Sequence, residues 1–428
     1  MRSILLTMVF VVGVISVQAQ KTYLHCGQLI DVKQLKVLTQ KTVIIEGNKI
    51  IDIVDGYAKA GVTDKTIDLK SSTVMPGLMD MHVHIESETS PSHYLDEFTL
   101  NTADYALAAV PIAQKTLMAG FTSVRDLGGS GANISLRKAI QKGYVVGPRI
   151  YTAGKAIATT GGHADPTNGY NEYLMGDPGP KDGVINGVED AYKAVRQRYK
   201  EGSDVIKITA SGGVLSMSAN GQNSQFTDEE LKAIVAASKD YGFKVAAHCH
   251  GAEAMKRAIK AGVNSIEHGT LMDDEVYPLM KKYGTYLVPT IIAGRSSMDS
   301  AKIPGYFPPV VAKKALEIGP KSQTNFARAY KEGVKIAFGT DAGVFKHGNN
   351  WLEFKYMQEA GMPIIEAIQA ATWNAADLMG TQATLGSIEI NKLADIIAVD
   401  GDPLKNVNSM GQVNFVMKDG VIYKLAAK

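Results

Sequence analysis

The chain has 428 residues, of which 45% are hydrophobic and 21% are charged, and 45 basic against 43 acidic residues leave a net charge of +2. This near-neutral balance gives no reason to expect a nucleic acid or an anionic membrane as a partner. The two cysteines, Cys26 and Cys249, are too few for a disulfide framework. The length and composition are those of a globular protein with room for one large α/β domain and a smaller second domain.

The first 19 residues have the pattern of a secretory signal peptide. Arg2 precedes an apolar run over residues 4–14, and the small-residue sequence Val17-Gln18-Ala19 ends directly before Gln20. The apolar run is too short to span a membrane. We therefore expect cleavage, export to the periplasm or the medium, and no stable membrane insertion. An uncleaved N-terminal anchor is the alternative.

Short strands with turn residues between them are expected from residue 20 to residue 75, and strands alternate with helices from residue 76 onward. Thr227 and Glu230 form a capping box that begins one of the helices, and Gly242 is expected to end it. Eight strand–helix units predict a (β/α)8 TIM barrel over residues 76–381. The eight strands are expected at residues 78–84, 122–126, 149–153, 205–210, 245–250, 265–268, 286–289 and 336–341.

The last part of the chain, residues 382–428, returns to strand patterning with Gly and Asp turns. We expect these strands to pair with those of residues 20–75. The small β domain would then be split between the two ends of the chain.

Six side chains with metal-binding or basic groups lie at the ends of expected strands. Because side chains alternate along a strand, His82 and His84 share one face. Inward-facing side chains at the C-terminal ends of parallel strands converge in a closed barrel. A lone strand histidine is usually a hydrogen-bonded core residue and a lone lysine usually reaches water, but the joint pattern predicts a metal site. Its residues are His82, His84, Lys207, His248, His268 and Asp341.

Lys207 is the member of this set that predicts two metals. Beside metals a buried ammonium is disfavoured, so the neutral amine can react with carbon dioxide. The resulting carbamate (N6-carboxylysine) would bridge two cations as a carboxylate does. Nitrogen and oxygen ligands without thiolate suit zinc, manganese, cobalt or iron. Of these metals, we expect zinc.

Seven sequence segments resemble those of the amidohydrolase superfamily, and the resemblance covers nearly the whole chain. Within it, the chain is most similar to the imidazolonepropionase-related and Xaa-Pro-dipeptidase-like branch. That branch includes acyl-amino-acid carboxypeptidases and amidases that degrade ochratoxin A. The segments are PGLMDMHVH, TSVRDLGG, DVIKITASGG, VAAHCHG, SIEHG, GTDAG and GSIEINKLADIIAVDGDPL.

The resemblance implies a distorted barrel with a β-sandwich built from both termini. It also implies that His82 and His84, with Asp341, bind the more buried metal. By the same resemblance His248 and His268 bind the other metal, and carbamylated Lys207 bridges the two. A homo-oligomer is expected.

The expected function is that of a binuclear metal-dependent amidohydrolase that cleaves the amide bond to a C-terminal amino acid. Dipeptides and N-acyl-amino acids, including ochratoxin A, are the candidate substrates. A metal-bridged hydroxide would attack the carbonyl, and Asp341 would act as general base and then as general acid. One alternative is a cyclic-amide hydrolase or deaminase that acts on a heterocycle. Another is a non-catalytic assembly protein of the same fold.

Substrate-binding residues are less well defined by the sequence. His250 and His163 are the candidates for holding a substrate carboxylate or carbonyl, and for His250 a supporting hydrogen bond is the alternative. Residues 159–187, rich in Gly, Pro, Asn and Asp, would either cover the barrel mouth or form a solvated surface excursion. Arg125 could bind a carboxylate, but a structural ion pair between Arg125 and Asp126 is expected instead.

Overall fold

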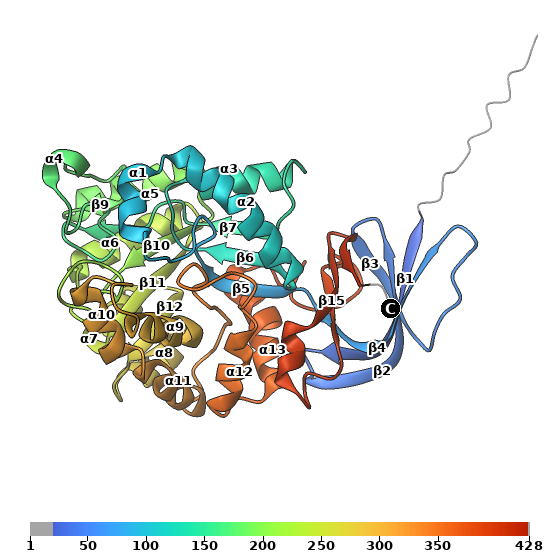
Figure 1. Ribbon diagram of the computed structural model, residues 1–428. Coiled ribbons are helices and arrows are strands. Elements are labelled where there is room, and N and C mark those ends of the chain that lie inside the picture. The colour runs from blue at the N-terminus through green and yellow to red at the C-terminus, as the bar shows by residue number, and fades with distance from the viewer. Residues whose placement is uncertain (1–19, 427–428) are drawn as a thin grey trace, which may run out of the picture.

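The computed structural model describes residues 20–426, so the expected signal peptide lies outside the described residues. A barrel surrounded by helices lies beside a sheet in which N-terminal (blue) and C-terminal (red) strands come together (Figure 1). Within residues 20–426, no helix is both long and apolar enough to cross a membrane.

The terminal sheet has seven strands drawn from both ends of the chain, in the order β16-β15-β14-β4-β1-β2-β3. It folds back on itself, because Lys49 in β3 bridges Leu393 just before β14. The enclosed space holds an apolar cluster that includes Leu24, Val74 and Phe415. The strands are β1 (Lys21–Asp31), β2 (Lys36–Glu46), β3 (Lys49–Asp55), β4 (Lys65–Pro76), β14 (Ile396–Asp400), β15 (Val413–Lys418) and β16 (Val421–Leu425).

Seven regular strands of the barrel form two parallel ladders, β5-β6-β7 and β10-β11-β12-β13. The ladders are joined where Ile157 bridges Ile208 and where the Asp204 amide donates to the Thr152 carbonyl at 2.8 Å. These strands are β5 (Leu78–Val83), β6 (Phe121–Asp126), β7 (Arg149–Thr152), β10 (Val205–Thr209), β11 (Lys244–Gly251), β12 (Ser265–Leu271) and β13 (Tyr286–Val288).

The eighth strand, expected at 336–341, is not a regular strand, so this prediction is wrong. The segment makes single bridges from Ile336 to Leu287 and from Ala342 to Val83, and these still close the barrel between β13 and β5. Asp341 has a φ of 60°, in the left-handed region, which is incompatible with a continuous ladder.

Helices cover the outside of the barrel, and α6 begins at the expected capping box. The Glu230 amide donates to Thr227 Oγ1 at 3.2 Å, and the Thr227 amide donates to Glu230 Oε2 at 2.8 Å. Gly242, with a φ of 72°, follows the end of this helix as expected. Cys249 lies buried in the main apolar core and packs there as a small apolar side chain.

The helices of the barrel portion are α1 (His93–Thr99), α2 (Thr102–Met118), α3 (Ala132–Gln141), α4 (Glu172–Met175), α5 (Val188–Glu201), α6 (Asp228–Asp240), α7 (Ala252–Ala261), α8 (Val276–Tyr283), α9 (Ile291–Ala301), α10 (Pro309–Ile318), α11 (Lys321–Lys331), α12 (Leu352–Glu359), α13 (Ile364–Gln369) and α14 (Ala375–Met379). A π-helical turn (Ala370–Asn374) joins α13 to α14, and a 3-10 turn (Val407–Gly411) precedes β15. Two short strands, β8 (Ala158–Thr159) and β9 (Val184–Ile185), pair at the two ends of the 159–187 segment.

Candidate metal and substrate site

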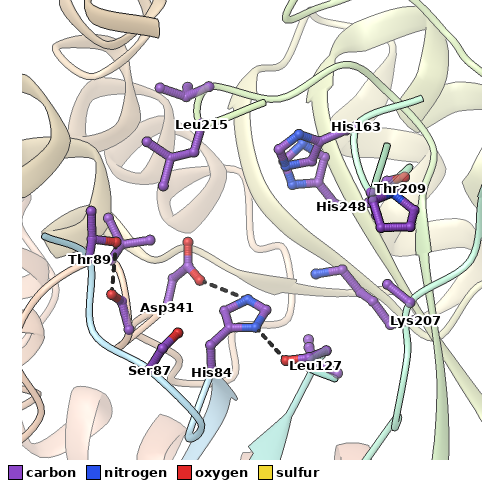
Figure 2. A pocket seen from close by; sticks show the side chains of 18 of the residues that line it. His84, Ser87, Thr89, Leu127, His163, Lys207, Thr209, Leu215, His248 and Asp341 are labelled. Carbon is purple, nitrogen blue, oxygen red and sulfur yellow. Dashed lines mark hydrogen bonds and ion pairs between the residues drawn. The ribbon is translucent and has the colours of Figure 1, made fainter. Parts of the chain in front are cut away.

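A cavity of about 950 Å³ opens at the C-terminal ends of the barrel strands. All eight residues expected to bind metal or substrate contribute to its lining, and Figure 2 shows several of them facing one another across it. They are His82, His84, His163, Lys207, His248, His250, His268 and Asp341.

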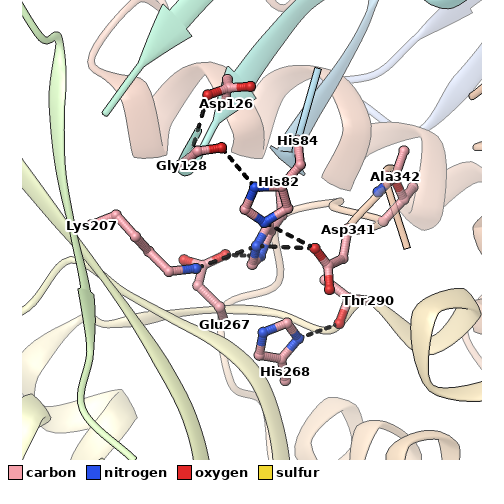
Figure 3. Close-up of polar contacts among 12 residues, drawn as sticks. His82, His84, Asp126, Gly128, Lys207, Glu267, His268, Thr290, Asp341 and Ala342 are labelled. Carbon is pink, nitrogen blue, oxygen red and sulfur yellow. Dashed lines mark hydrogen bonds and ion pairs between the residues drawn. The ribbon is translucent and has the colours of Figure 1, made fainter. Parts of the chain in front are cut away.

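The base of the cavity brings together His82, Lys207 and Asp341 (Figure 3). The Nε2 atom of His82 lies 3.3 Å from Lys207 Nζ and 3.4 Å from Asp341 Oδ1. The same Asp341 oxygen lies 3.3 Å from His84 Nε2, so one carboxylate oxygen faces two imidazoles. The four side chains come from the C-terminal end of β5 and the residue after it, from the middle of β10, and from the segment that closes the barrel.

The other histidines form a contiguous group beside these residues. The ring centroid of His248 lies 4.6 Å from that of His268, 4.7 Å from that of His250 and 4.4 Å from that of His163. Hydrogen-bond partners orient them, since His268 Nδ1 lies 2.7 Å from Thr290 Oγ1 and His250 Nδ1 lies 2.9 Å from Thr270 Oγ1.

Three of these residues lie close enough together to hold one metal ion. The ligand atoms of His82, His268 and Asp341 all lie within 4.8 Å of one another. This group combines members of both of the expected metal sites. Imidazole nitrogens with a hard carboxylate oxygen are a donor set that suits zinc and similar divalent ions, so the residues present fit the expected cofactor.

His268 reaches the site by a route that strand alternation does not predict. Glu267 and Ser265 carry the inward side chains of β12, because both contact the interior guanidinium of Arg125. The register pairs His268 with Cys249, which lies in the outer core. His268 turns back to the site because its φ is 71°. A left-handed non-glycine residue at a site is a form of stored strain, and the inward parity expected for His268 is wrong.

Burial shapes the proton affinities of the site. It lowers the pKa of Lys207 to about 8 and that of His250 to about 4, so His250 is neutral at pH 7. Burial also holds the pKa values of His82, His248 and His268 well below the usual range, so these imidazoles are neutral at pH 7. For Asp341, burial is outweighed by the neighbouring His82 and His84, and its pKa is lowered.

Glu267 belongs to the site, although the sequence pattern did not predict it. It is fully buried, and its Oε2 lies 3.0 Å from His82 Nδ1 while its Oε1 lies 2.8 Å from Arg125 Nη2. A carboxylate behind a ligand histidine fixes the ring and leaves the other nitrogen as a lone-pair donor. Its position one residue before His268 is the signal that could have found it.

The ion pair expected between Arg125 and Asp126 is wrong. Arg125 donates to Met81 O, Ser265 Oγ and Glu267 Oε1 in the barrel interior. Asp126 faces the other way and accepts from the Asn133 side chain at 2.7 Å and from the Ile85 amide at 2.8 Å. Adjacent residues of a strand point to opposite faces, which is why the two side chains cannot meet.

Residues 159–187 cover one side of the cavity, as expected for a covering loop. They do not form a surface loop that projects away from it. The His163 ring packs against His248, and the His163 amide donates to Gln225 Oε1 at 2.9 Å. Near the outer rim, Lys155 pairs with Asp182 at 3.1 Å. The lining members of the segment are His163, Ala164, Pro166, Thr167, Met175, Gly176, Asp177, Pro178 and Asp182.

The family model for the amidohydrolase family matches residues 73–423, and the chain belongs to this family. The ochratoxinase of Aspergillus niger is 33% identical over 436 residues, with 95% of this chain and 87% of that protein covered. A solved Xaa-Pro dipeptidase with methionine bound in its active site is 52% identical at a TM-score of 0.92, with 95% of this chain and 100% of that chain covered. A solved prolidase complexed with N-methylphosphonate-L-proline is 31% identical at a TM-score of 0.86, with 95% and 100% covered.

These similarities confirm the expected superfamily and branch. They also confirm the fold class, a (β/α)8 barrel with a β-sandwich built from both termini. The chain is an enzyme, a hydrolase that acts on amide bonds.

Proposed function

We propose that this chain is a binuclear metal-dependent hydrolase that cleaves the amide bond to a C-terminal amino acid in a dipeptide or an N-acyl-amino acid. The proposal rests on one observation. His82, His268 and Asp341 lie with their ligand atoms within 4.8 Å of one another at the base of a cavity of about 950 Å³. The names of two solved relatives, a Xaa-Pro dipeptidase and a prolidase, support this substrate class. Ochratoxin A, suggested by the name of the ochratoxinase relative, is a further candidate substrate.

Two zinc ions are the proposed cofactor. His82, His84 and Asp341 would hold one ion, His248 and His268 the other, and Lys207 would act as a carbamate between them. When bound, such ions polarise a carbonyl and lower the pKa of a water molecule to about 7.

Asp341 is the proposed proton carrier. Its lowered pKa keeps it ionised at neutral pH, so it can accept a proton from the attacking water. Its Oδ1 atom pairs with His84 Nε2 at 3.3 Å and lies 3.4 Å from His82 Nε2, which places the carboxylate at the base of the cavity. Donation of the same proton to the leaving nitrogen would complete the cleavage.

His250 is the proposed ligand for the substrate carboxylate. Its pKa of about 4 makes it a neutral imidazole. If the Thr270 hydroxyl donates to Nδ1, the Nε2 atom carries the hydrogen and can donate to an anion in the cavity. His163, whose buried Nδ1 has no hydrogen-bond partner among the described residues, is the second candidate.

The test is a screen of N-acyl-amino acids and dipeptides, each with a free and with an amidated carboxylate. Loss of a charge-assisted hydrogen bond should lower kcat/KM for the blocked substrates by about tenfold to a hundredfold. The His250→Ala variant should reduce the difference in kcat/KM between free and blocked substrates. Equal turnover of free and blocked substrates would instead favour a hydrolase or deaminase that acts on a heterocycle. Export and homo-oligomeric assembly stay predictions of the sequence.

A further inference from the structure

Lys314 is a buried cation behind one wall of the cavity, and the mechanism above does not use it. It lies on α10 with 4% of its surface exposed. Its Nζ atom donates to three main-chain carbonyls at 2.7 Å each, those of Gly213, Ser216 and Ser218. An ammonium group has three N–H donors, so these carbonyls occupy all of them.

The three carbonyls belong to one short stretch, residues 213–218, which we call the roof segment. Val214 and Leu215 of this segment line the cavity, and Figure 2 shows Leu215 across the cavity from His84. A second side chain holds the segment from another direction, because the Tyr94 hydroxyl donates to the Leu215 carbonyl at 2.7 Å. The roof segment is therefore fixed between α1 and α10.

The roof segment also lies directly against a proposed substrate ligand. A Cβ atom at Gly213 would lie 2.2–2.4 Å from ring atoms of His163, so a larger residue at this position would displace that ring. On the same side, Ala315 and Ile318 of α10 line the cavity. Together with Val214 and Leu215 they form an apolar wall next to His163.

We propose that Lys314 is a positioning residue that holds this apolar roof in place, and that the roof selects substrates whose leaving amino acid has an apolar side chain. The selectivity rests on the proposed function, since a carboxylate held at His163 and His250 would place the side chain of that amino acid near the roof. Lys314 has no N–H donor left for the substrate, because all three are taken by carbonyls. Burial of an apolar side chain against Val214, Leu215 and Ile318 is then what distinguishes one leaving group from another.

The test compares Lys314→Met with Lys313→Met, a matched control at an exposed position of the same helix. With N-acetyl-L-leucine, Lys314→Met should raise KM roughly tenfold while kcat stays within about twofold. With N-acetylglycine, KM should change by less than about twofold. Metal content should match the wild type, and Lys313→Met should behave as the wild type. An equal KM change for both substrates, or loss of metal, would overturn the proposal.

A readout without turnover separates this proposal from the proposed function. Hydrogen exchange at the amides of residues 213–218 should be faster in Lys314→Met and unchanged in Lys313→Met. If the wild type hydrolyses neither substrate, the proposed function fails, while exchange still reports whether Lys314 holds the roof. Unchanged exchange in Lys314→Met would rule that role out.

Tyr94→Phe provides a second variant in case Lys314→Met does not fold, since it removes one hydroxyl near the surface. Its KM for N-acetyl-L-leucine should rise about two- to fourfold, less than in Lys314→Met, and its KM for N-acetylglycine should not change. Wild-type KM values for both substrates with unchanged exchange at residues 213–218 would contradict a roof held from both sides.

Discussion

Lys207, His82 and Asp341 share the base of the cavity, so the charge of each depends on the other two. Lys207 is the residue whose state matters most for assembly of the proposed site. Its pKa of about 8 lies below the usual value for lysine, because burial disfavours the ammonium. As the pH rises through this value, the neutral amine becomes the main form in the metal-free protein. Only that form reacts with carbon dioxide.

We therefore predict that zinc loading of the metal-stripped enzyme depends on pH and on bicarbonate. At about pH 9, bicarbonate should accelerate the recovery of metal content, and at about pH 6.5 the effect should be small. The measurement is zinc bound per chain against time. Lys207→Met should show no response to bicarbonate. A wild type that loads equally well with and without bicarbonate at both pH values would exclude the carbamate.

Single residues also show what the sequence could reveal. His82, His84, Lys207 and Asp341 were predictable because strand ends in a parallel barrel converge, and the structure brings all four together. His268 was correctly predicted to face the site, but the reason was wrong. A left-handed backbone with a φ of 71°, and not strand alternation, turns its side chain inward. Left-handed backbone at a histidine has no local sequence signature.

At the scale of secondary structure, α6 shows how one side chain can serve a helix and a loop together. Glu230 completes the capping box with Thr227, and its Oε1 also accepts from the Gly187 amide at 2.7 Å. Gly187 ends the 159–187 segment that covers the cavity. The capping box thus fixes both the start of α6 and the end of the covering segment.

Glu230→Ala should accordingly cost more than loss of the cap alone. We expect Thr227→Ala to lower the free energy of unfolding by about 1 kcal/mol and Glu230→Ala by roughly a further 1 kcal/mol for the lost bond to Gly187. Urea denaturation measures both. Glu230→Ala should also speed proteolysis within residues 159–187, while Thr227→Ala should not. Equal cleavage rates in the two variants would show that Glu230 does not fix the covering segment.

The elements themselves were largely predictable, with one informative failure. Seven barrel strands appear where alternation with helices indicated, because buried parallel strands have continuous apolar runs between turns. The eighth, at residues 336–341, had the same apolar character. It makes only single bridges, and the left-handed backbone at Asp341 accompanies the placement of its carboxylate beside His82 and His84.

At the scale of the whole molecule, the terminal sheet and the barrel are joined by a charged contact. Arg149 at the start of β7 binds Asp395 at 2.8 Å and Asp419 at 2.6 Å, and both carboxylates belong to the C-terminal part of the chain. Strand patterning predicted that the two chain ends would pair, and they do in a seven-stranded sheet. It could not predict this contact, because long-range ion pairs leave no periodic pattern in a sequence.

We propose that the cavity base holds two divalent ions on which amide hydrolysis depends. The most direct measurement is a zinc titration of the metal-stripped protein, with hydrolysis of a free-carboxylate N-acyl-amino acid followed alongside. We predict that activity is absent without metal, is fully restored at two equivalents per chain, and does not return in Lys207→Met. Full activity of the metal-free protein, or saturation at a single equivalent, would contradict the two-metal site.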